Sequence, residues 1–587
     1  MKNILKKFVP ELGFTCVLLL LTYLLQFSKE NWEYQVISSD GRGYYAYLPA
    51  LFLQKDHTFQ KTAEVEAKSY SNAVQQHYLH LDARGQSFNK YYPGLSVLQT
   101  PFFATACAVS KITGRPLTGY TKLFHVCVLL GSVFYAVVGF YFFRKYLELR
   151  LENRRWSLLI AGLVFFGTNV FYYVVKYPSM GHGYSFALFA AFAYFVVRYS
   201  DAGKRRQALA LGFILGIIFL LRPTNLLIVL AIPFLLGSKA ATLDFFRRLF
   251  QLKNGHLLFG ALSFGSMVSI LFLLWKWQTG HWIIWSYQGE GFNFAHPQFW
   301  KTLWSYRTGV LLLLPMALIA TIGAVLLTFK NTFQGISWFV YMAVLTYLTS
   351  SWWCWDYAGS FGHRIYVEHW VFLGLPLFAF LTQVRWKALA VGAVSLALLL
   401  NTGRAYQLNQ DIITLQRFNA DTYWKSLLAF DRSASGTFYS YVQCQPYGKI
   451  RKAWKTAVTA PQETLEVLPE NEFSCSVDFT YPQDRGDHKF FFRASFDKFR
   501  DEDKPIDNIF WVIDATDTLT GKRAYMAYPF YEYKAEAAGC WKHLVIETEV
   551  EDTQSEFHVA KLYLWNPGKN KLSLRNVAVS IEEFVAE

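Results

Sequence analysis

The sequence predicts an all-α polytopic membrane bundle of about 11–13 transmembrane helices, followed by a C-terminal all-β sandwich domain. Two observations predict the bundle. Hydrophobic residues make up 53% of the 587 residues, and they gather in runs of roughly 15 to 24 up to about residue 402. A run of about 20 apolar residues matches the ~30 Å hydrocarbon core of a bilayer. A third observation predicts the sandwich, because the polar tail contains short segments of alternating apolar and polar residues.

The first span is expected at about 10–28, and its basic start indicates a retained first helix with a cytoplasmic N-terminus. A long outer loop, 29–92, follows it. Later spans are expected near 121–143, 157–175, 183–198, 208–221, 224–237, 257–277, 308–328, 333–350, 369–384 and 386–402. The turn Arg222–Asn225 contains Pro223 and interrupts the apolar sequence near membrane depth, where non-helical backbone has to line a cavity or be buried in protein.

The positive charge of the chain is best explained by membrane topology. The formal net charge is +15 and the pI is about 9.2, which would also suit a nucleic-acid-binding protein. The basic residues, however, cluster at the ends of predicted helices, as is typical of cytoplasmic loops. These clusters are Arg144, Lys145, Arg150, Arg154 and Arg155; Arg198, Lys204, Arg205 and Arg206; Arg247, Arg248 and Lys253; Arg385 and Lys387. We therefore expect no nucleic-acid partner.

The apolar segment 93–112 leaves the topology with two solutions. If it spans the membrane, the basic loop 144–155 lies outside, against the charge rule. If it is re-entrant, that loop lies inside. Arg385 and Lys387 in the last short loop independently place the tail outside. The polar segments Tyr177–Gly183, Arg222–Asn225, 278–307 and Trp352–His369 then share the outer face with the first loop.

The chain is expected to have three parts: a membrane domain at 1–402, a partly helical linker at 403–470 and a β-sandwich at 471–587. The sandwich strands are expected at Phe473–Tyr481, Lys489–Phe499, Ile509–Ala515, Ala524–Tyr533, His543–Val550 and His558–Trp565. The turn at 566–570 favours a final hairpin. Of the cysteines Cys444, Cys475 and Cys540 in the tail, two would pair in an oxidising compartment.

The first outer loop carries the most distinctive polar motif. Asp40 lies about a dozen residues after the first helix, and Gly41 and Gly43 on either side of Arg42 allow the backbone to bend tightly. The tyrosine-rich stretch after them is expected to form an amphipathic helix along the membrane interface. A solvated loop carboxylate is the plain alternative for Asp40.

This motif, Asp-Gly-x-Gly-Tyr-Tyr-x-Tyr-Leu-Pro-Ala-Leu at 40–51, resembles the start of the GT-C superfamily of membrane glycosyltransferases. The superfamily includes protein O-mannosyltransferases and the lipid A aminoarabinose transferase, which use polyprenyl-phosphate sugars and keep an essential acid in the first outer loop. The segment 89–94 resembles the Lys-Pro-Pro segment that ends this loop, with one proline replaced. The segments Gly167–Asn169 with Pro178 and His182, Arg222–Pro223 and Gly359–Arg364 also resemble bacterial members, so the likeness covers roughly residues 10–400.

The resemblance implies a sugar transferase of the bacterial inner membrane. Its donor would be a polyprenyl-phosphate-linked sugar, its acceptor a glycan, lipid or protein, and its C-terminal domain would be periplasmic. Such a transfer needs a base for the acceptor hydroxyl and cations for the donor phosphate. Asp40 is the candidate base, placed opposite the phosphate in an inverting transfer, and Lys90, Arg222 and Arg364 are candidate phosphate ligands. Alternatively, Arg222 snorkels to the interface, Arg364 pairs with Asp356 or Glu368, and Lys90 is a surface residue.

Further candidates for substrate contacts are Tyr44, Tyr45, His182, Glu290, Trp355 and His363. His182 would otherwise cap a helix, and the run 352–357 would otherwise be an interfacial aromatic belt.

No cofactor is required by the sequence. Asp40 with Asp56 or a histidine such as His57 would hold a divalent metal, as in some relatives, but no spacing specifies one.

Two other functions fit parts of the sequence. A transporter or flippase of lipid-linked glycans would explain the intramembrane arginines and the broken helix, although no internal repeat is present. A glycan-binding or assembly protein would use the β domain. No Walker A motif, dinucleotide-binding fingerprint or HExxH pattern occurs, so nucleotide-driven, redox and zinc-protease functions have no support.

Overall fold

The computed structural model describes residues 2–27, 32–70, 78–82, 84–410, 412–413, 415, 418, 420–430, 437–442, 449–460, 463–482, 489–499, 509–521, 523–529, 541–550 and 557–585. The chain divides into two compact units. The helical unit comprises Met1–Ser305, Gly309–Trp355 and Phe361–Asn409, and the β unit comprises Tyr306–Thr308, Asp356–Ser360 and Gln410–Glu587. The predicted fold class, a helical membrane bundle with a C-terminal β domain, is confirmed.

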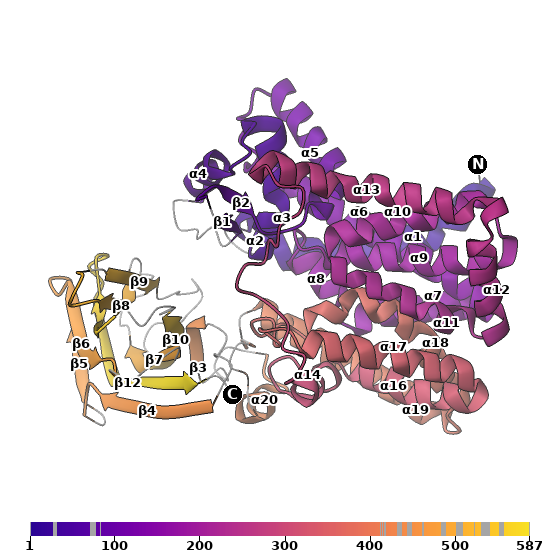
Figure 1. Cartoon of the computed structure of the whole chain (residues 1–587). Coiled ribbons are helices and arrows are strands. Elements are labelled where there is room, and N and C mark those ends of the chain that lie inside the picture. Colours follow the sequence, from indigo (N-terminus) through magenta and orange to yellow (C-terminus); the bar gives the residue numbers. More distant parts are fainter. Residues whose placement is uncertain are drawn as a thin grey trace. The chain divides into compact units, whose positions relative to one another are not determined.

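The first half of the helical unit combines long helices with a compact first loop. Its elements are α1 (Lys2–Thr22), η1 (Tyr23–Phe27), α2 (Glu33–Val36), α3 (Asp40–Pro49), η2 (Ala50–Gln54), α4 (Gln60–Ser69), β1 (Leu79–Leu81), β2 (Ser87–Asn89), α5 (Gly94–Ile112), α6 (Lys122–Leu151), α7 (Arg154–Gly167), α8 (Val170–Lys176), α9 (His182–Ala202) and α10 (Arg205–Leu221). In Figure 1, α1, α6, α9, α10 and α13 run side by side, and α13 lies at the edge of the bundle.

The second half contains shorter and more irregular elements. They are η3 (Pro223–Ala231), α11 (Ile232–Leu236), α12 (Lys239–Phe250), η4 (Leu252–Asn254), α13 (His256–Thr279), α14 (Phe299–Trp304), α15 (Val310–Leu313), α16 (Pro315–Lys330), α17 (Thr332–Ser350), η5 (Arg364–Leu373), α18 (Gly374–Gln383) and α19 (Lys387–Asn409). The non-helical turn predicted at 222–225 is present, because α10 ends at Leu221 and η3 starts at Pro223 with 3-10 rather than α-helical geometry.

Six helices in the described part of the chain are long and apolar enough to cross a membrane. They are Val9–Phe27, Gly94–Ile112, Lys122–Leu151, His256–Thr279, Arg364–Gln383 and Lys387–Asn409. Helices α7 and α8 add a seventh span if the pair, which is bent by 59° between Gly167 and Val170, crosses as one. The remaining predicted spans are also helical, but they are shorter or less apolar, so this criterion supports fewer spans than the expected 11–13.

Helix α5 covers the ambiguous segment 93–112, and the residues near its start and beyond its end both contact α3. Near its start, the Ser96 hydroxyl donates a 2.6 Å hydrogen bond to the Tyr44 carbonyl. Beyond its end, the Gly119 carbonyl accepts a 2.6 Å hydrogen bond from the Tyr45 hydroxyl. Because Tyr44 and Tyr45 are neighbours in α3, the chain leaves α3 and returns to it. The chain before α5 and the chain after it therefore both lie at α3, and the length and composition of α5 allow a membrane span.

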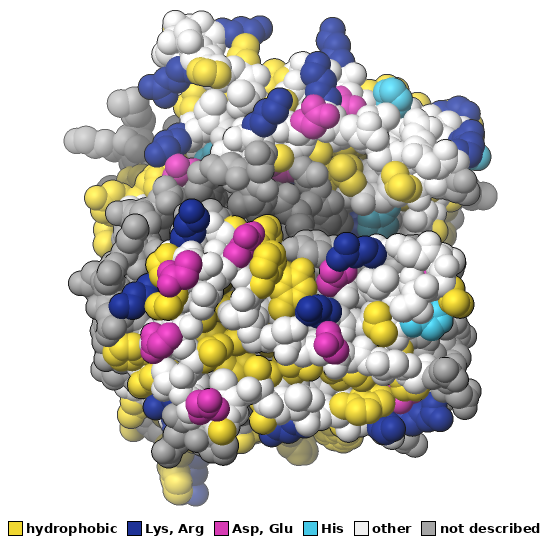
Figure 2. All heavy atoms as spheres, turned by 90° about the vertical axis from the view of Figure 1, so that its left-hand side faces the viewer, with side chains coloured by type: hydrophobic (Ala, Val, Ile, Leu, Met, Phe, Trp, Pro, Cys, Tyr) yellow, Lys and Arg dark blue, Asp and Glu magenta, His cyan; other side chains and the backbone are white. Residues whose placement is uncertain are grey.

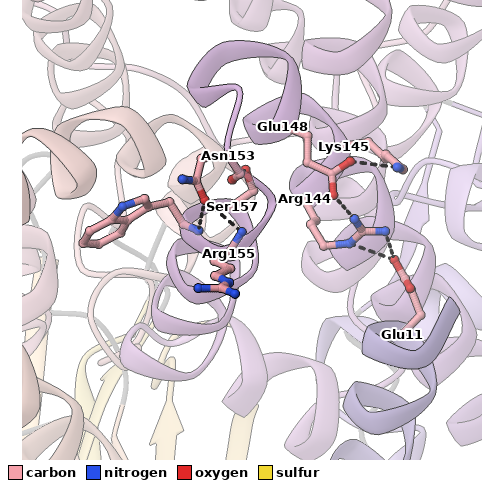
Figure 3. A network of polar contacts seen from close by, with 8 residues as sticks. Glu11, Arg144, Lys145, Glu148, Asn153, Arg155 and Ser157 are labelled. Atoms are coloured by element: carbon pink, nitrogen blue, oxygen red, sulfur yellow. Dashed lines mark hydrogen bonds and ion pairs between the residues drawn. The ribbon is translucent and has the colours of Figure 1, made fainter. Parts of the chain in front are cut away.

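A buried ionic cluster joins α1 to α6. The Arg144 guanidinium, 1% exposed, donates from Nε to Glu11 at 2.9 Å and also pairs with Glu148, which Lys145 contacts at 2.7 Å. Figure 3 shows Glu11 reaching Arg144 from the neighbouring helix, with Glu148 on its other side. Buried charges in a membrane bundle are stable only when they are paired. This cluster therefore holds the end of α6 to the start of α1.

The β unit contains two sheets around one core. Its elements are α20 (Ala420–Ser426), β3 (Thr437–Val442), β4 (Lys449–Ala457), β5 (Thr464–Val467), β6 (Phe473–Thr480), β7 (Lys489–Phe499), β8 (Phe510–Thr516), β9 (Arg523–Pro529), β10 (Lys542–Val550), β11 (Val559–Trp565) and β12 (Leu572–Val585). One sheet has the order β3-β10-β7-β12-β4 with β5 beside β12, and the other has the order β6-β11-β8-β9. On the face drawn in Figure 2, basic and acidic side chains lie among hydrophobic ones.

Two expectations for the tail need correction. The segment 403–470, expected as a linker, contains α20 as well as three strands of the larger sheet, β3, β4 and β5. The turn at 566–570 forms, since Asn566 bonds to Asn570, but it is no hairpin. β11 belongs to the smaller sheet and β12 to the larger one, so the turn crosses between sheets.

Cys475 is a buried free thiol, and Cys444 and Cys540 lie outside the described residues.

We predict that Arg144→Leu destabilises the protein by about 3–5 kcal/mol, because Glu11 keeps its buried charge without a cation. The double variant Glu11→Leu/Arg144→Leu should recover much of this loss, since apolar side chains replace the pair. Thermal unfolding in detergent measures both. A double variant as unstable as Arg144→Leu would show that the pair is not the cause.

Candidate functional site

The candidate site is built on α3, whose first residue is Asp40. A carboxylate in the first turn of a helix interacts favourably with the unpaired backbone N–H groups there. The residue before it, Ser39, has a φ of 50°, which is uncommon for a non-glycine residue. This backbone turn directs the chain from the short α2 into α3. The helix predicted after the glycines is thus present, but it begins at Asp40 itself.

The two glycines of α3 permit close packing rather than a bend. A Cβ on Gly41 would collide with the Ser179 side chain, and one on Gly43 would collide with Tyr78 and Tyr91. Both glycines are buried inside the helix. The expected tight bend around Arg42 is therefore corrected: the glycines let α3 lie directly against the segments that complete the site.

Asn89 fixes the segment after β2 against α3. Its side-chain amide, fully buried, donates to the Gly43 carbonyl at 2.8 Å, and its side-chain oxygen accepts from the Tyr91 backbone N–H at 3.0 Å. The Tyr47 hydroxyl donates to the Tyr91 carbonyl at 2.7 Å. The backbone of Tyr91 is thus held on both sides, which aims its side chain back at the start of α3.

Asp40 is the centre of the site. One of its carboxylate oxygens accepts a 2.9 Å hydrogen bond from the Tyr91 hydroxyl, and the other pairs with Arg364 at 2.8 Å. Burial alone would raise the pKa of the Asp40 carboxyl, but Arg364, the Tyr91 hydrogen bond, Lys90 and Arg222 together lower it below its ordinary value. Burial raises the pKa of Tyr91, and the negative charge of Asp40 adds to this. Tyr91 therefore remains a hydrogen-bond donor to an ionised carboxylate.

Lys90 lies beside Asp40 and is only 12% exposed. Its ammonium pairs with Glu290 at 2.8 Å and lies 5.3 Å from the ring centre of Tyr91 and 5.6 Å from that of Tyr287. The aromatic rings and the carboxylate together stabilise the cation in this half-buried position. The structure thus places Glu290 in the site and excludes the alternative that Lys90 is an ordinary surface residue.

Arg222 reaches the site from the end of α10. Its guanidinium pairs with Glu368 at 3.2 Å, and Glu368 also accepts from His182 at 3.0 Å and from Asn225 at 2.9 Å. Glu368 is 1% exposed, whereas the Arg222 side chain is 23% exposed. Arg222 therefore has a fixed buried partner, which corrects the snorkelling alternative. Arg222 also lowers the pKa of the Tyr44 hydroxyl, against the larger raising effect of burial.

The two neighbouring tyrosines of α3 face different surroundings. The Tyr44 ring lies 4.7 Å from that of Tyr91, next to Asp40. Tyr45 instead contacts Phe103 and Tyr120 and donates to the Gly119 carbonyl. Tyr45 is therefore part of the packing between α3 and α5, and its contact with substrate stays a prediction.

The segment before Arg364 is a strained loop. Tyr357, Ala358 and His363 have φ values of 48°, 58° and 59°, which non-glycine residues seldom adopt. His363 is fully buried, contacts the Trp355 carbonyl at 3.0 Å and has a pKa lowered to about 3 by burial. It therefore fixes the loop as a neutral side chain. Trp355 lies 5.7 Å from the Lys301 ammonium, and Asp356 pairs with Arg307 rather than with Arg364.

The residues proposed for a metal do not come together. Asp56 accepts hydrogen bonds from the backbone and side chains of Thr58 and Thr62, which explains a pKa lowered in spite of burial. His57 is exposed and lies against Trp277. Within the described ranges, no three His, Cys, Asp or Glu side chains are grouped as a metal site. The predicted set Asp40, Asp56 and His57 is thus not assembled.

Sequence reasoning missed three residues of this site, Tyr91, Tyr287 and Glu368. Tyr91 was part of the motif at 89–94, but only its contact with Asp40 distinguishes it from other tyrosines. Tyr287 lies on an irregular loop with no periodicity. Glu368 carried a usable signal, because a carboxylate inside an apolar span is seldom present without a function or a buried partner.

Comparisons with known proteins give a distant likeness. No protein-family model and no curated protein matches the chain. Among solved structures, it is similar to the arabinosyltransferase EmbB from Mycobacterium smegmatis, with 9% identity and a TM-score of 0.35 over 93% of this chain and 64% of that one. It is also similar to the oligosaccharyltransferase of Archaeoglobus fulgidus, with 10% identity over 73% of this chain and 59% of that one. The TM-score is 0.38 for the apo form and 0.37 for the complex with an inhibitory peptide and a dolichol-phosphate.

Both neighbours are glycosyltransferases, the class of protein that the first-loop motif resembles. The chain spans less than two thirds of the length of either neighbour. At these identities and TM-scores, the likeness assigns neither an activity nor individual residues to the chain.

We predict that Gly43→Ala destabilises the protein by about 1–3 kcal/mol, because its methyl group has to displace the Tyr91 and Tyr78 side chains. Gly13→Ala is the matched control, since a Cβ at Gly13 meets no atom within 4 Å. Thermal unfolding in detergent compares the two. Equal melting temperatures for the two variants would contradict the close packing of α3 against Tyr91.

Proposed function

We propose that the protein transfers a sugar from a polyprenyl-phosphate-linked donor to an acceptor hydroxyl at the outer face of the membrane. One observation carries the proposal: an ionised carboxylate, Asp40, bonds Arg364 at 2.8 Å and lies in the field of Lys90 and Arg222. A base beside several cations is the combination that glycosyl transfer from a phosphate requires.

The reaction assigns a role to each group. The acceptor oxygen bonds to the anomeric carbon of the sugar while the bond from that carbon to the phosphate oxygen breaks. Asp40 takes the acceptor proton, and the bonding electrons leave with the phosphate. Because the pKa of Asp40 is lowered, the carboxylate is available at neutral pH. The phosphate needs no proton, since it leaves as a weak base whose charge Arg364, Arg222 and Lys90 stabilise.

Charge balance indicates how a donor would enter. The cations Lys90, Arg222 and Arg364 are matched by the carboxylates Glu290, Glu368 and Asp40. An added phosphate has to replace one carboxylate. Glu368 is buried and Asp40 is needed as the base, whereas Glu290 lies on the irregular segment between α13 and α14. We therefore propose that the donor phosphate displaces the Glu290 carboxylate and takes its place beside the Lys90 ammonium.

The distribution of surface residues supports the outer face. Trp386 lies between α18 and α19, whereas the other exposed tryptophans of the helical unit lie at the end of α13, after it and around the site segments, as in the aromatic belt of a membrane interface. They are Trp277, Trp282, Trp285, Trp300, Trp304 and Trp353. The basic clusters lie at the other helix ends, as the positive-inside rule requires of the cytoplasmic side. Cys354, next to Trp353, is disulfide-bonded, which suits an oxidising compartment such as the periplasm.

We predict that Asp40→Asn abolishes measurable transfer, with a loss of about 10²–10⁴-fold, while the protein still inserts and folds. Asp82→Asn is the matched control, because Asp82 also lies in the first loop but caps its own turn. The assay follows a radiolabelled polyprenyl-phosphate sugar in proteoliposomes. Full activity of Asp40→Asn would refute the base assignment, and movement of the labelled lipid without turnover would instead support a transporter.

We also predict that the acidic limb of the pH profile of kcat/KM lies below about pH 4 and moves to higher pH in Arg364→Gln. Asp40 stays ionised until the pH falls through its lowered pKa, whose ordinary value is 3.8. Burial raises the pKa of Asp40 and Arg364 opposes this most strongly, so the pKa rises when Arg364 is removed. Profiles normalised to pH 7 separate this shift from lost phosphate binding. Arg385→Gln should keep the wild-type profile, and an unchanged limb in Arg364→Gln would contradict the coupling.

A further inference from the structure

We infer that Glu368 is a positioning residue that holds Arg222 for the donor phosphate, an inference that rests on the proposed function. Glu368 lies on η5, four residues after Arg364, and its carboxylate is 1% exposed. It accepts hydrogen bonds from three different elements: His182 at the start of α9, Arg222 at the end of α10 and Asn225 in η3.

The three contacts compensate the cost of burying a carboxylate. Burying an unpaired carboxylate is costly, and only a cation with further hydrogen bonds offsets that cost. Arg222 is the residue in the trio whose charge is permanent. His182 and Asn225 occupy other acceptor positions of the same carboxylate. The network therefore has one defined geometry, in which the guanidinium of Arg222 is fixed from the buried side.

Arg222 connects this buried network with the Asp40 group. Its Nη1 contacts Glu368, and the same side chain acts on the Tyr44 hydroxyl and on the Asp40 charge. An arginine side chain otherwise loses rotamer entropy when a ligand fixes it. Because Glu368 already fixes Arg222, the donor phosphate meets a guanidinium that needs little further ordering. Glu368 thus acts through Arg222 and touches neither substrate nor product.

The alternative is that Glu368 merely neutralises charge in the bundle, and three substitutions separate the two roles. Glu368→Gln keeps one acceptor oxygen, which can still serve Asn225 in place of Oε1, but it removes the charge that holds Arg222 and the second oxygen that His182 contacts. Glu368→Asp retains the charge but shortens the side chain by one methylene group. This moves the carboxylate away from the Arg222 guanidinium. Glu11→Gln is the matched control, because Glu11 is also a buried carboxylate that bonds an arginine, Arg144, in the same unit.

The test measures binding of undecaprenyl phosphate to each variant in detergent, by the change in tryptophan fluorescence. We expect Kd to rise about tenfold in Glu368→Gln and by less in Glu368→Asp, and to stay at the wild-type value in Glu11→Gln. In an Arg222→Gln background, Glu368→Gln should change Kd by less than about twofold, because a residue that acts through Arg222 has no effect without it.

The outcomes separate this inference from the proposed function. If the wild-type protein and Asp40→Asn do not bind the lipid phosphate, the proposed donor site is wrong and the inference falls with it. If they bind but Glu368→Gln and Glu368→Asp keep the wild-type Kd, only the positioning role is refuted. The positioning role is also refuted if the increase in Kd of the double variant equals the product of the increases in Glu368→Gln and Arg222→Gln, because the two residues then act independently. Should Glu368→Gln not fold, the Kd of Glu368→Asp decides alone: a wild-type value indicates a purely neutralising carboxylate.

Discussion

The ion pair between Asp40 and Arg364 connects the two ends of the membrane sequence, 324 residues apart. Each residue begins a helical segment, α3 and η5 respectively. A carboxylate is favourable at a helix start, whereas an arginine there faces unpaired N–H groups of the same sign. Asp40 compensates this repulsion, so the pair lets η5 start at the site. The surrounding polar groups depend on that start, because Glu368 follows Arg364 on the same segment and orders Arg222, His182 and Asn225 in turn.

Much of the fold follows from patterns that are local in the sequence. Apolar runs predicted the long helices, and alternation predicted β6, β7, β8, β10 and β11 to within one or two residues. The errors arose where local pattern and tertiary contacts differ. The composition of α5 did not reveal that the Ser96 hydroxyl donates to the Tyr44 carbonyl and that the Tyr45 hydroxyl donates to the Gly119 carbonyl, which brings both flanking segments to α3. Strands β3, β4 and β5 were assigned to a linker, because nothing in their own residues reveals that they pair with distant strands.

In the candidate site, too, local sequence patterns identified some residues, whereas their tertiary contacts could not be predicted. Motif and charge identified Asp40, Lys90, Arg222 and Arg364, which the structure brings together. The partners of the cations were not predictable from spacing, since Lys90 and Glu290 are 200 residues apart and Arg222 and Glu368 are 146 apart. Tyr44 and Tyr45 were predicted together as substrate contacts, but consecutive residues on a helix point about 100° apart. One of them faces Asp40 and the other faces α5.

The pairing of every site cation with a carboxylate has a consequence for selectivity. A free phosphate ion gains little from this site, because it has to separate Lys90 from Glu290 to bind and obtains only an equivalent ion pair. A phosphate attached to a long apolar chain is already concentrated at the membrane surface by the burial of that chain, at about 0.8 kcal/mol per methylene group. Binding energy from this remote part of the ligand can offset the separation of Lys90 from Glu290. If the site binds the donor of the proposed function, its charge-balanced resting state favours a lipid-linked phosphate over a soluble one without any contact that recognises the lipid itself.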